Sequence, residues 1–206
     1  SSTMEHFSQA ADNNKAPILE LLRTCLPQNG SVLEVGSGSG QHAIYFSAAM
    51  SGLRWQPSER PSMLSTLTRN IETYGGANVL LPVTLDLEEN AWPAQSFDAV
   101  YSANVLHIVS VALGTKLIAG AGQVLKAGGL LICYGPFKYN GNFTTPSNEA
   151  FDASLKARDG DSGIRDFEWV CDHARGAGLA FIQDQPMPAN NQCLVFRRVP
   201  EGSVAQ

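Results

Sequence analysis

The sequence predicts an α/β fold, in which a mostly parallel sheet is covered by helices on both faces. Apolar runs of strand length alternate with segments whose apolar residues recur at helical spacing. One apolar run ends in Glu34 and then Gly36, Gly38 and Gly40, directly before a helical pattern, which indicates a strand, a tight turn and a helix. Two further apolar runs close the chain and predict an antiparallel hairpin.

The first half of the chain predicts three helices that alternate with three strands. Pro17 is tolerated in the first turn of the first helix, and Gly75 and Gly76 end the third helix. The predicted helices are residues 15–25, 41–50 and 61–74, and the predicted strands are residues 31–35, 53–56 and 79–86.

The second half predicts four more strands, which brings the sheet to seven. A polar stretch, residues 135–166, interrupts the pattern, and we expect it to be a lid or a substrate-binding insertion. The predicted strands are residues 97–102, 130–134, 180–185 and 192–199, and the predicted helices are residues 112–125, 148–158 and 166–177.

Whole-chain properties favour one domain. The 206 residues suffice for one core, which we expect over about residues 10–199, with a loose tail over residues 200–206. The net charge of −5 argues against nucleic acid or an anionic membrane as the main partner.

Cysteine usage and the lack of targeting patterns favour a cytoplasmic protein. The cysteines show no metal-ligand spacing, so we expect reduced thiols and no metal site; they are Cys25, Cys133, Cys171 and Cys193. The sequence contains no apolar stretch long enough to span a bilayer and no signal-peptide pattern at its start.

The glycine turn predicts a cofactor site. Glycines let a ligand approach the backbone closely, and the helix that follows offers free N–H groups. The spacing is Gly-x-Gly-x-Gly, not the Gly-x-Gly-x-x-Gly of dinucleotide folds, and no phosphate-binding Gly-Lys-Ser/Thr follows. With Glu34 it resembles the first motif of class I S-adenosylmethionine-dependent methyltransferases. The alternative is a glycine-rich turn without a ligand.

Acids after the next strands extend this site. Glu59 stands where a ribose-binding fold places a carboxylate, at the tip of the second strand. Asp86 ends the third strand; the methyltransferase resemblance implies that it faces the adenine amino group, with the Leu87 N–H on a ring nitrogen. Asp86 is alternatively a cap of the turn before Glu88. Asn104 follows the fourth strand, where the chain passes the methionine part of the cofactor.

Several separate motifs, in order, resemble the DUF938 family of methyltransferase-like proteins. They occupy residues 14–19, 36–42, 55–59, 103–108, 134–137, 146–155 and 187–191. The resemblance runs from about residue 10 to residue 198 and implies a single-domain, Rossmann-like class I methyltransferase fold with bound S-adenosylmethionine, but no particular substrate. The chain departs from the family at Asn13 (usually Arg), Glu59 (usually Asp) and Ser162 (often Trp).

The cofactor-binding prediction combines these motifs with the glycine turn. Glu34 is expected to fix the turn or to bind the amino group of the cofactor. The predicted residues are Asn14, Lys15, Glu34, Gly36, Ser37, Gly38, Gly40, Gln41, His42, Glu59, Asp86, Leu87 and Asn104.

The predicted acceptor side follows the fourth and fifth strands. His107 is the candidate base, with a packing role as its alternative, and Tyr134 is the second catalytic candidate. Tyr134 and Phe137 either form aromatic walls of the pocket or pack in the core. The predicted substrate-binding residues are Phe137, Asn148, Asp152, Arg158, Arg165 and Asn190. Their charged members grip a polar acceptor or, alternatively, form a structural ion-pair network.

Three functional hypotheses follow from the sequence. The favoured one is in-line methyl transfer from S-adenosylmethionine to nitrogen, oxygen or sulfur of a small polar metabolite. The second is a non-catalytic S-adenosylmethionine-binding protein that acts through a partner. The third is a nicotinamide oxidoreductase, which the glycine spacing and the closing hairpin disfavour.

Overall fold

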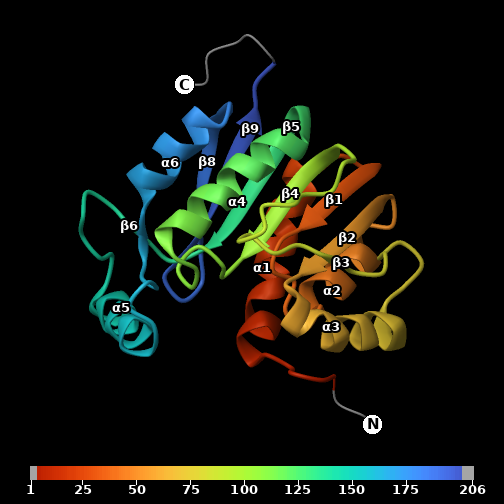
Figure 1. The fold of residues 1–206 in the computed structure, drawn as a ribbon, viewed down its shortest axis with the longest axis horizontal. Helices are drawn as coiled ribbons and strands as arrows, with labels where there is room; N and C mark the ends of the chain where they lie inside the picture. The colour runs from red at the N-terminus through yellow and green to blue at the C-terminus, as the bar shows by residue number, and fades with distance from the viewer. Residues whose placement is uncertain (1–3, 201–206) are drawn as a thin grey trace. The chain divides into compact units, whose positions relative to one another are not determined.

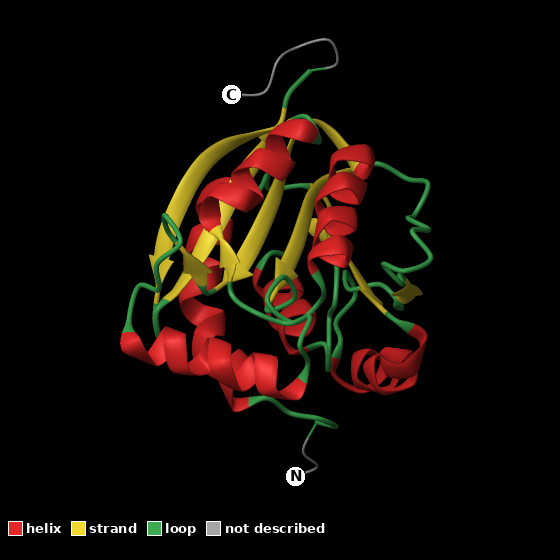
Figure 2. Ribbon diagram, turned by 60° about the vertical axis from the view of Figure 1, so that its left-hand side comes forward, coloured by secondary structure: helices red, strands yellow, loops and turns green. Residues whose placement is uncertain are grey.

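A computed structural model describes residues 4–200 and confirms the predicted α/β fold class. Its main sheet has seven strands in the order β3-β2-β1-β4-β5-β9-β8 (Figure 1). Figure 2 shows how helices and strands alternate. The helices are α1 (Gln9–Cys25), α2 (Gln41–Ala49), α3 (Pro61–Tyr74), α4 (Val111–Val124), α5 (Pro146–Arg158) and α6 (Phe167–Gly176). The strands are β1 (Gly30–Glu34), β2 (Leu53–Glu59), β3 (Val83–Thr84), β4 (Phe97–Ala103), β5 (Leu125–Gly135), β6 (Phe137–Lys138), β7 (Arg165–Asp166), β8 (Leu179–Met187) and β9 (Asn191–Arg198).

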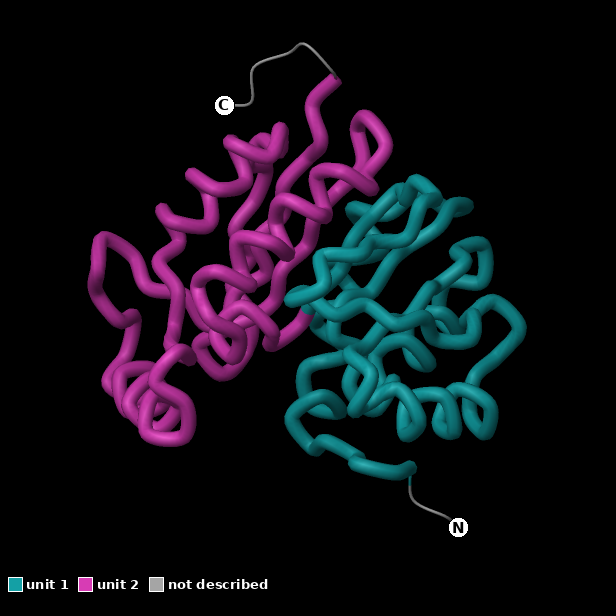
Figure 3. Tube along the Cα trace, in the orientation of Figure 1, with its two compact units in different colours: residues 1–102 teal, residues 103–206 magenta. Residues whose placement is uncertain are grey.

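The chain falls into two compact units, which meet in sequence between Ser102 and Ala103 (Figure 3). In the first unit β1 pairs in parallel with both β2 and β4, and β2 pairs in parallel with β3. The carboxyl ends of parallel strands lie at the same edge of a sheet, so the ends of β1 and β2 lie side by side. This register places the last residues of both strands next to the glycine turn.

The core of the first unit is an aromatic cluster behind the glycine turn. Phe46, Trp55 and Tyr101 are fully buried, and their ring centroids are 5.6–5.8 Å apart. Helices α2 and α3 both contact β2, and α1 contacts α2. Edge-to-face aromatic pairs add about 0.5–1.5 kcal/mol each to the burial of their area, so this cluster gives the turn a rigid support.

Two predicted elements of the first unit need correction. Helix α1 begins at Gln9, earlier than predicted, because the Ser8 hydroxyl caps it by accepting from the Ala11 N–H; Pro17 therefore lies inside the helix and not in its first turn. The predicted strand over residues 79–86 is reduced to β3 and one bridge from Val79 to Trp55. Pro82, just before β3, has no N–H to continue the ladder.

The second unit confirms the closing hairpin. β9 pairs antiparallel with β5 and with β8, and residues 188–190 form the turn. Helices α4 and α6 pack against each other, α4 also against β5 and α6 against β8. The polar stretch of residues 135–166 holds α5 and both strands of a short parallel pair, β6 with β7. This pair escaped prediction, since two-residue strands have no periodicity.

Within residues 4–200, no helix is both long enough and apolar enough to cross a bilayer. The predicted loose tail begins at Pro200, and its remaining residues, 201–206, lie outside the described part of the chain.

Candidate functional site

The glycine turn joins β1 to α2 and needs glycine for two different reasons. Gly36, Gly38 and Gly40 have φ values of 74°, 58° and 91°, a region that disfavours side chains. A Cβ on Gly40 would stand 2.9 Å from Cδ1 of Leu67, so Gly40 permits close packing of the turn on α3. A Cβ on Gly38 would meet no heavy atom within 4 Å. The space beside Gly38 is therefore open.

Glu59 connects the end of β2 to this turn. The Gly38 N–H donates to Glu59 Oε2 at 2.9 Å, and the Arg60 N–H donates to Oε1 at 2.9 Å. The Ser37 N–H also donates to the Ser58 carbonyl at 2.9 Å. Glu59 is half-buried, so its carboxylate keeps access to a ligand as well as to the turn.

Glu34 lies buried beneath the turn and holds it in place. Its Oε1 accepts from the Ser37 hydroxyl at 2.9 Å and from Trp55 Nε1 at 3.1 Å. The Ser37 hydroxyl in turn accepts from the Ser58 N–H at 3.1 Å. Burial raises the pKa of the Glu34 carboxyl to about 7, although the two donors oppose the shift and the charge of Glu59 adds to it.

His42 links α2 to α1 and to β4. Its Nε2 lies 2.7 Å from Asn14 Oδ1 and 3.3 Å from the Ala11 carbonyl, and its Nδ1 lies 3.0 Å from the Tyr101 hydroxyl. Two acceptors at Nε2 mean that Nε2 carries the proton and Nδ1 accepts from Tyr101. Burial lowers the pKa of His42 to about 4, with the Ala11 carbonyl opposing and the charge of Lys15 assisting.

The remaining predicted cofactor residues of this unit also have partners within the protein. Gln41 binds the backbone of Ser8 through both its amide atoms, and Lys15 pairs with Asp12 at 2.6 Å. Asp86 accepts from the Glu88 N–H at 3.0 Å, which is the turn cap named as its alternative. Leu87 is buried. Asn14, Gln41 and His42 thus hold α1 and its N-cap against the helix that follows the turn.

In the second unit, the predicted catalytic residues lie near the ends of β4 and β5. Asn104 has a φ of 58°, and its N–H donates to the Tyr134 carbonyl at 2.9 Å. Tyr134 is buried and faces Cys193 in the ladder between β5 and β9. Asn104 thus turns the chain directly after β4 and leads it towards His107.

His107 is buried without a hydrogen-bond partner for its ring among residues 4–200. Its ring meets Phe151 edge-on at 5.6 Å, and a Cβ on Gly135 would stand 3.3 Å from its Nδ1. Burial lowers the pKa of His107 to about 4, and the charge of Arg165 lowers it further. The imidazole is therefore neutral at physiological pH and keeps a free acceptor nitrogen.

The structure brings together some of the predicted substrate-binding residues. The Asn148 amide donates to the Asn190 carbonyl at 3.2 Å, which joins the start of α5 to the hairpin. Asp152 accepts from the Ile164 N–H at 2.8 Å and pairs with Lys156 at 2.9 Å. Burial opposes ionisation of Asp152, but these partners outweigh it and lower its pKa.

The other three predicted substrate-binding residues differ in their surroundings. Arg165 donates to the carbonyls of Leu106, Val109 and Asp161 at 2.7–3.0 Å. Phe137 is buried, as in its core-packing alternative. Arg158 ends α5 and is exposed, with no partner among residues 4–200.

Sequence reasoning missed the residues that support the predicted ones. Ser58 and Trp55 hold the turn, and Phe151 and Gly163 contact His107. Trp55, Ser58 and Phe151 lie inside motifs that were noted only as a resemblance, so their position was a usable signal. Gly163 directly follows Ser162, a position where the chain departs from the family, so it carried a signal as well.

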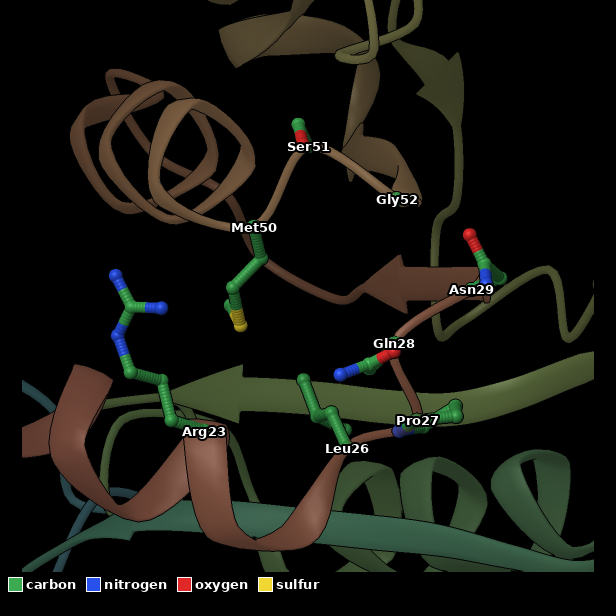
Figure 4. A pocket seen from close by; sticks show the side chains of 8 residues that line it. All are labelled: Arg23, Leu26, Pro27, Gln28, Asn29, Met50, Ser51 and Gly52. Atoms are coloured by element: carbon green, nitrogen blue, oxygen red, sulfur yellow. The ribbon is translucent and has the colours of Figure 1, made fainter.

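A pocket of about 420 Å³ lies elsewhere in the first unit (Figure 4). It is lined by residues of the α1–β1 and α2–β2 loops, and its one cation is Arg23. None of the predicted site residues lines it.

Comparison with known proteins supports the fold. A family model described as "Protein of unknown function (DUF938)" matches residues 5–198. An O-methyltransferase family 2 protein from Planctomyces limnophilus, solved with apigenin, is 20% identical, with a TM-score of 0.78 over 92% of this chain and 58% of that one. The S-adenosylmethionine-dependent methyltransferase SibL, solved in its apo form, is 21% identical, with a TM-score of 0.77 over 93% of this chain and 56% of that one.

A third solved structure, PigF with SAH, is 16% identical, with a TM-score of 0.75 over 88% of this chain and 55% of that one. The chain thus spans little more than half the length of these three proteins. At these identities the likeness shows the methyltransferase fold.

Proposed function

Because this chain belongs to the DUF938 family and its first strand leads into an acid-preceded Gly-x-Gly-x-Gly turn, we propose that it is an S-adenosylmethionine-dependent methyltransferase. The observation that carries the proposal is the 2.9 Å hydrogen bond from the Gly38 N–H to Glu59. It joins the two sequence features expected to hold a nucleoside, the glycine turn and the acid that ends β2.

The residues present fit such a cofactor. The space beside Gly38 is open, and α2 begins after its N-cap Gly40 without a side-chain cap or an acid in its first turn. A carboxylate has about four lone-pair sites, and the described donors to Glu59, from Gly38 and Arg60, leave sites for ribose hydroxyls. Glu34 Oε1 accepts both of its described donors, which leaves Oε2 for the ligand.

The chemistry asks little of the protein beyond alignment and proton removal. When bound, S-adenosylmethionine supplies a methyl group already activated by the positive sulfonium. The neutral His107 imidazole accepts the proton of an acceptor hydroxyl, amine or thiol. Because burial keeps His107 neutral, no proton has to leave it before it can act as a base.

We propose a small, polar acceptor. A base such as His107 serves an acceptor that carries a proton, and Arg158 is the cation of the insertion that remains without a described partner among residues 4–200. Arg165 is occupied by backbone carbonyls, so a two-point grip on a carboxylate would fall to Arg158. The roles of Tyr134, Phe137, Asn148, Asp152 and Asn190 toward the acceptor stay predictions.

Calorimetric titration tests the cofactor. We expect S-adenosylhomocysteine to bind and NADH not to bind. Glu59→Ala should weaken binding about 10- to 100-fold, because a charged hydrogen bond contributes about 1.5–3 kcal/mol. Glu72→Ala, an exposed acid of α3, is the matched control. Unchanged affinity for Glu59→Ala would remove Glu59 from the site, and NADH binding would favour an oxidoreductase.

Labelled-methyl transfer tests catalysis. The protein is incubated with methyl-labelled S-adenosylmethionine and a pooled metabolite extract, and labelled products are separated and identified. We expect a labelled small molecule, reduced strongly by His107→Gln. Cofactor binding without a labelled product would favour the non-catalytic alternative.

A further inference from the structure

The segment that carries His107 is held by an unusual set of backbone contacts. Residues 106–109 form a turn between β4 and the Ser110 cap of α4, so their carbonyls have no partner in a helix or a strand. All four carbonyls nevertheless accept a hydrogen bond from residues 162–165. We call residues 162–165 the latch.

Arg165 makes the two outer contacts and spans the turn. Its Nε donates to the Leu106 carbonyl at 3.0 Å and its Nη2 to the Val109 carbonyl at 2.7 Å. Between them, the Gly163 N–H donates to the His107 carbonyl at 2.9 Å, and the Ser162 hydroxyl donates to the Ile108 carbonyl at 2.5 Å. The backbone on both sides of His107 is therefore fixed.

The latch is itself anchored through its last two residues, Ile164 and Arg165. The buried Asp152 of α5 accepts from the Ile164 N–H at 2.8 Å. The Arg165 backbone pairs with Phe137 in the short β6–β7 ladder. Arg165 thus has a fixed backbone from which its planar, rigid guanidinium reaches two carbonyls at once.

The position of the His107 ring depends on this arrangement. The ring lies in a narrow place, against the Gly135 backbone on one side and the Phe151 ring on another. No hydrogen bond from residues 4–200 orients the imidazole itself, so its orientation follows from the backbone that carries it.

We propose that Arg165 is a positioning residue, which acts through the latch to hold the His107 imidazole for proton removal from the acceptor. The inference rests on the proposed function and replaces, for Arg165, the predicted contact with the acceptor. Misplacing a catalytic group by about 1 Å costs on the order of 100-fold in rate.

Two substitutions separate positioning from charge. Arg165→Lys keeps the positive charge beside His107 but cannot bridge two carbonyls, whereas Arg165→Met loses both. We expect both variants to lower kcat about 10- to 100-fold in the labelled-methyl assay, with the KM for S-adenosylmethionine unchanged. Arg175→Met, which removes an exposed ion pair of α6, is the matched control. Wild-type kcat in Arg165→Lys would overturn the proposal.

A second readout needs no acceptor. The ring nitrogens of His107 are followed by long-range ¹H–¹⁵N NMR, assigned with His107→Gln, and amide exchange is followed over residues 105–109. Both Arg165 variants should shift the ring signals and speed exchange, and Arg165→Met, which also loses the positive charge, should raise the pKa of His107; Arg175→Met should change none of these. If the wild-type protein methylates nothing, the proposed function fails. The ring signals and exchange rates still test whether Arg165 positions His107 through the latch.

Ser162→Ala provides a milder test of the latch if the Arg165 variants do not fold. It removes only the contact to Ile108, and thermal melting verifies that the variant is folded. We expect the same changes at His107 in smaller measure, with faster exchange over residues 105–109. Ring signals and exchange rates identical to those of the wild type would overturn the latch.

Discussion

Glu34 is a single buried residue whose hydrogen bonds connect the glycine turn to the aromatic core. Its Oε1 accepts from Ser37, which belongs to the glycine turn, and from Trp55, which belongs to the aromatic core. A buried carboxyl group prefers its neutral form, so the pKa of Glu34 rises to about 7. The group therefore couples the proton concentration to the stability of the turn.

Glu34→Gln should remove this coupling. The folded protein holds the Glu34 proton more tightly than the unfolded chain, so stability from this group falls as pH rises from about 4.5 to about 7, by up to about 3 kcal/mol. Glutamine keeps the accepting oxygen and does not titrate. We expect urea unfolding to show that the free energy of unfolding of Glu34→Gln rises relative to that of the wild type between about pH 5 and about pH 8.

The matched control for this experiment is Glu72→Gln, at an exposed position of α3. It should follow the wild type throughout. A stability difference between Glu34→Gln and the wild type that stays constant with pH would contradict the buried, neutral carboxyl.

Single residues also show which features of the site could be predicted from the sequence and which could not. Glu59 was predicted to stand at the tip of the second strand as a ribose-binding acid; it does end β2, and there it contacts Gly38. Arg165 was predicted to bind an acceptor because Arg suits carboxylates, but its guanidinium binds carbonyls of residues 106, 109 and 161. A sequence shows which side chains are charged, but it does not show which distant backbone groups lack partners.

At the scale of elements, the glycine turn combines two separable requirements. Gly40 lets α3 approach, whereas Gly38 keeps open the space in front of the turn. Both have positive φ, which costs a side chain about 1–2 kcal/mol. Substitution of either glycine should therefore lower stability. Substitution of Gly40 should also disturb packing against α3, whereas substitution of Gly38 should also lower ligand affinity.

Gly40→Ala should destabilise the protein more than Gly38→Ala, because its Cβ would stand 2.9 Å from Leu67 and 3.2 Å from Ile71. Gly38→Ala should instead lower the affinity for S-adenosylhomocysteine at least about tenfold, since its methyl enters the ligand space. Thermal melting and calorimetric titration of both variants measure the two effects. Full affinity in folded Gly38→Ala would place the ligand elsewhere.

Element boundaries were predictable where periodicity was long. Helix α3 has its predicted ends, and α2 and α4 differ from theirs by a single residue at most at either end. Prediction failed where local hydrogen bonding decides: Ser8 starts α1 early, and Pro82 shortens the third strand. The β6–β7 pair depends on contacts between distant segments, which no local pattern contains.

At the scale of the whole molecule, the sequence predicted the α/β class, the seven-stranded sheet and the closing hairpin, and the structure confirms them. These features follow from the alternation of strand and helix patterns along the whole chain. The predicted single domain and the lid role of residues 135–166 stay predictions. Each of the two compact units contains one buried, neutral histidine, His42 in the first and His107 in the second.

These two histidines should set the acid limit of stability. Burial lowers the pKa of both to about 4, below the ordinary value of 6.5, so the folded protein binds fewer protons than the unfolded chain. Their contribution is complete above about pH 6.5 and is lost as pH falls to about 4, by up to about 3 kcal/mol each. The contribution of Glu34 to the free energy of unfolding changes in the opposite direction over a similar pH range. The contributions of the two histidines together are larger than that of Glu34 alone.

We therefore expect the free energy of unfolding to fall as pH drops from about 6.5 to about 4, and His42→Gln and His107→Gln each to make this fall shallower. Urea unfolding across the range measures the slopes, and His6→Gln, at an exposed position, should keep the wild-type slope. His42→Gln will also lower stability at neutral pH, since His42 bridges Asn14 and Tyr101, but the slope is independent of that offset. An unchanged slope in either variant would mean that folding does not lower the pKa of that histidine, which would contradict its burial as a neutral imidazole down to about pH 4.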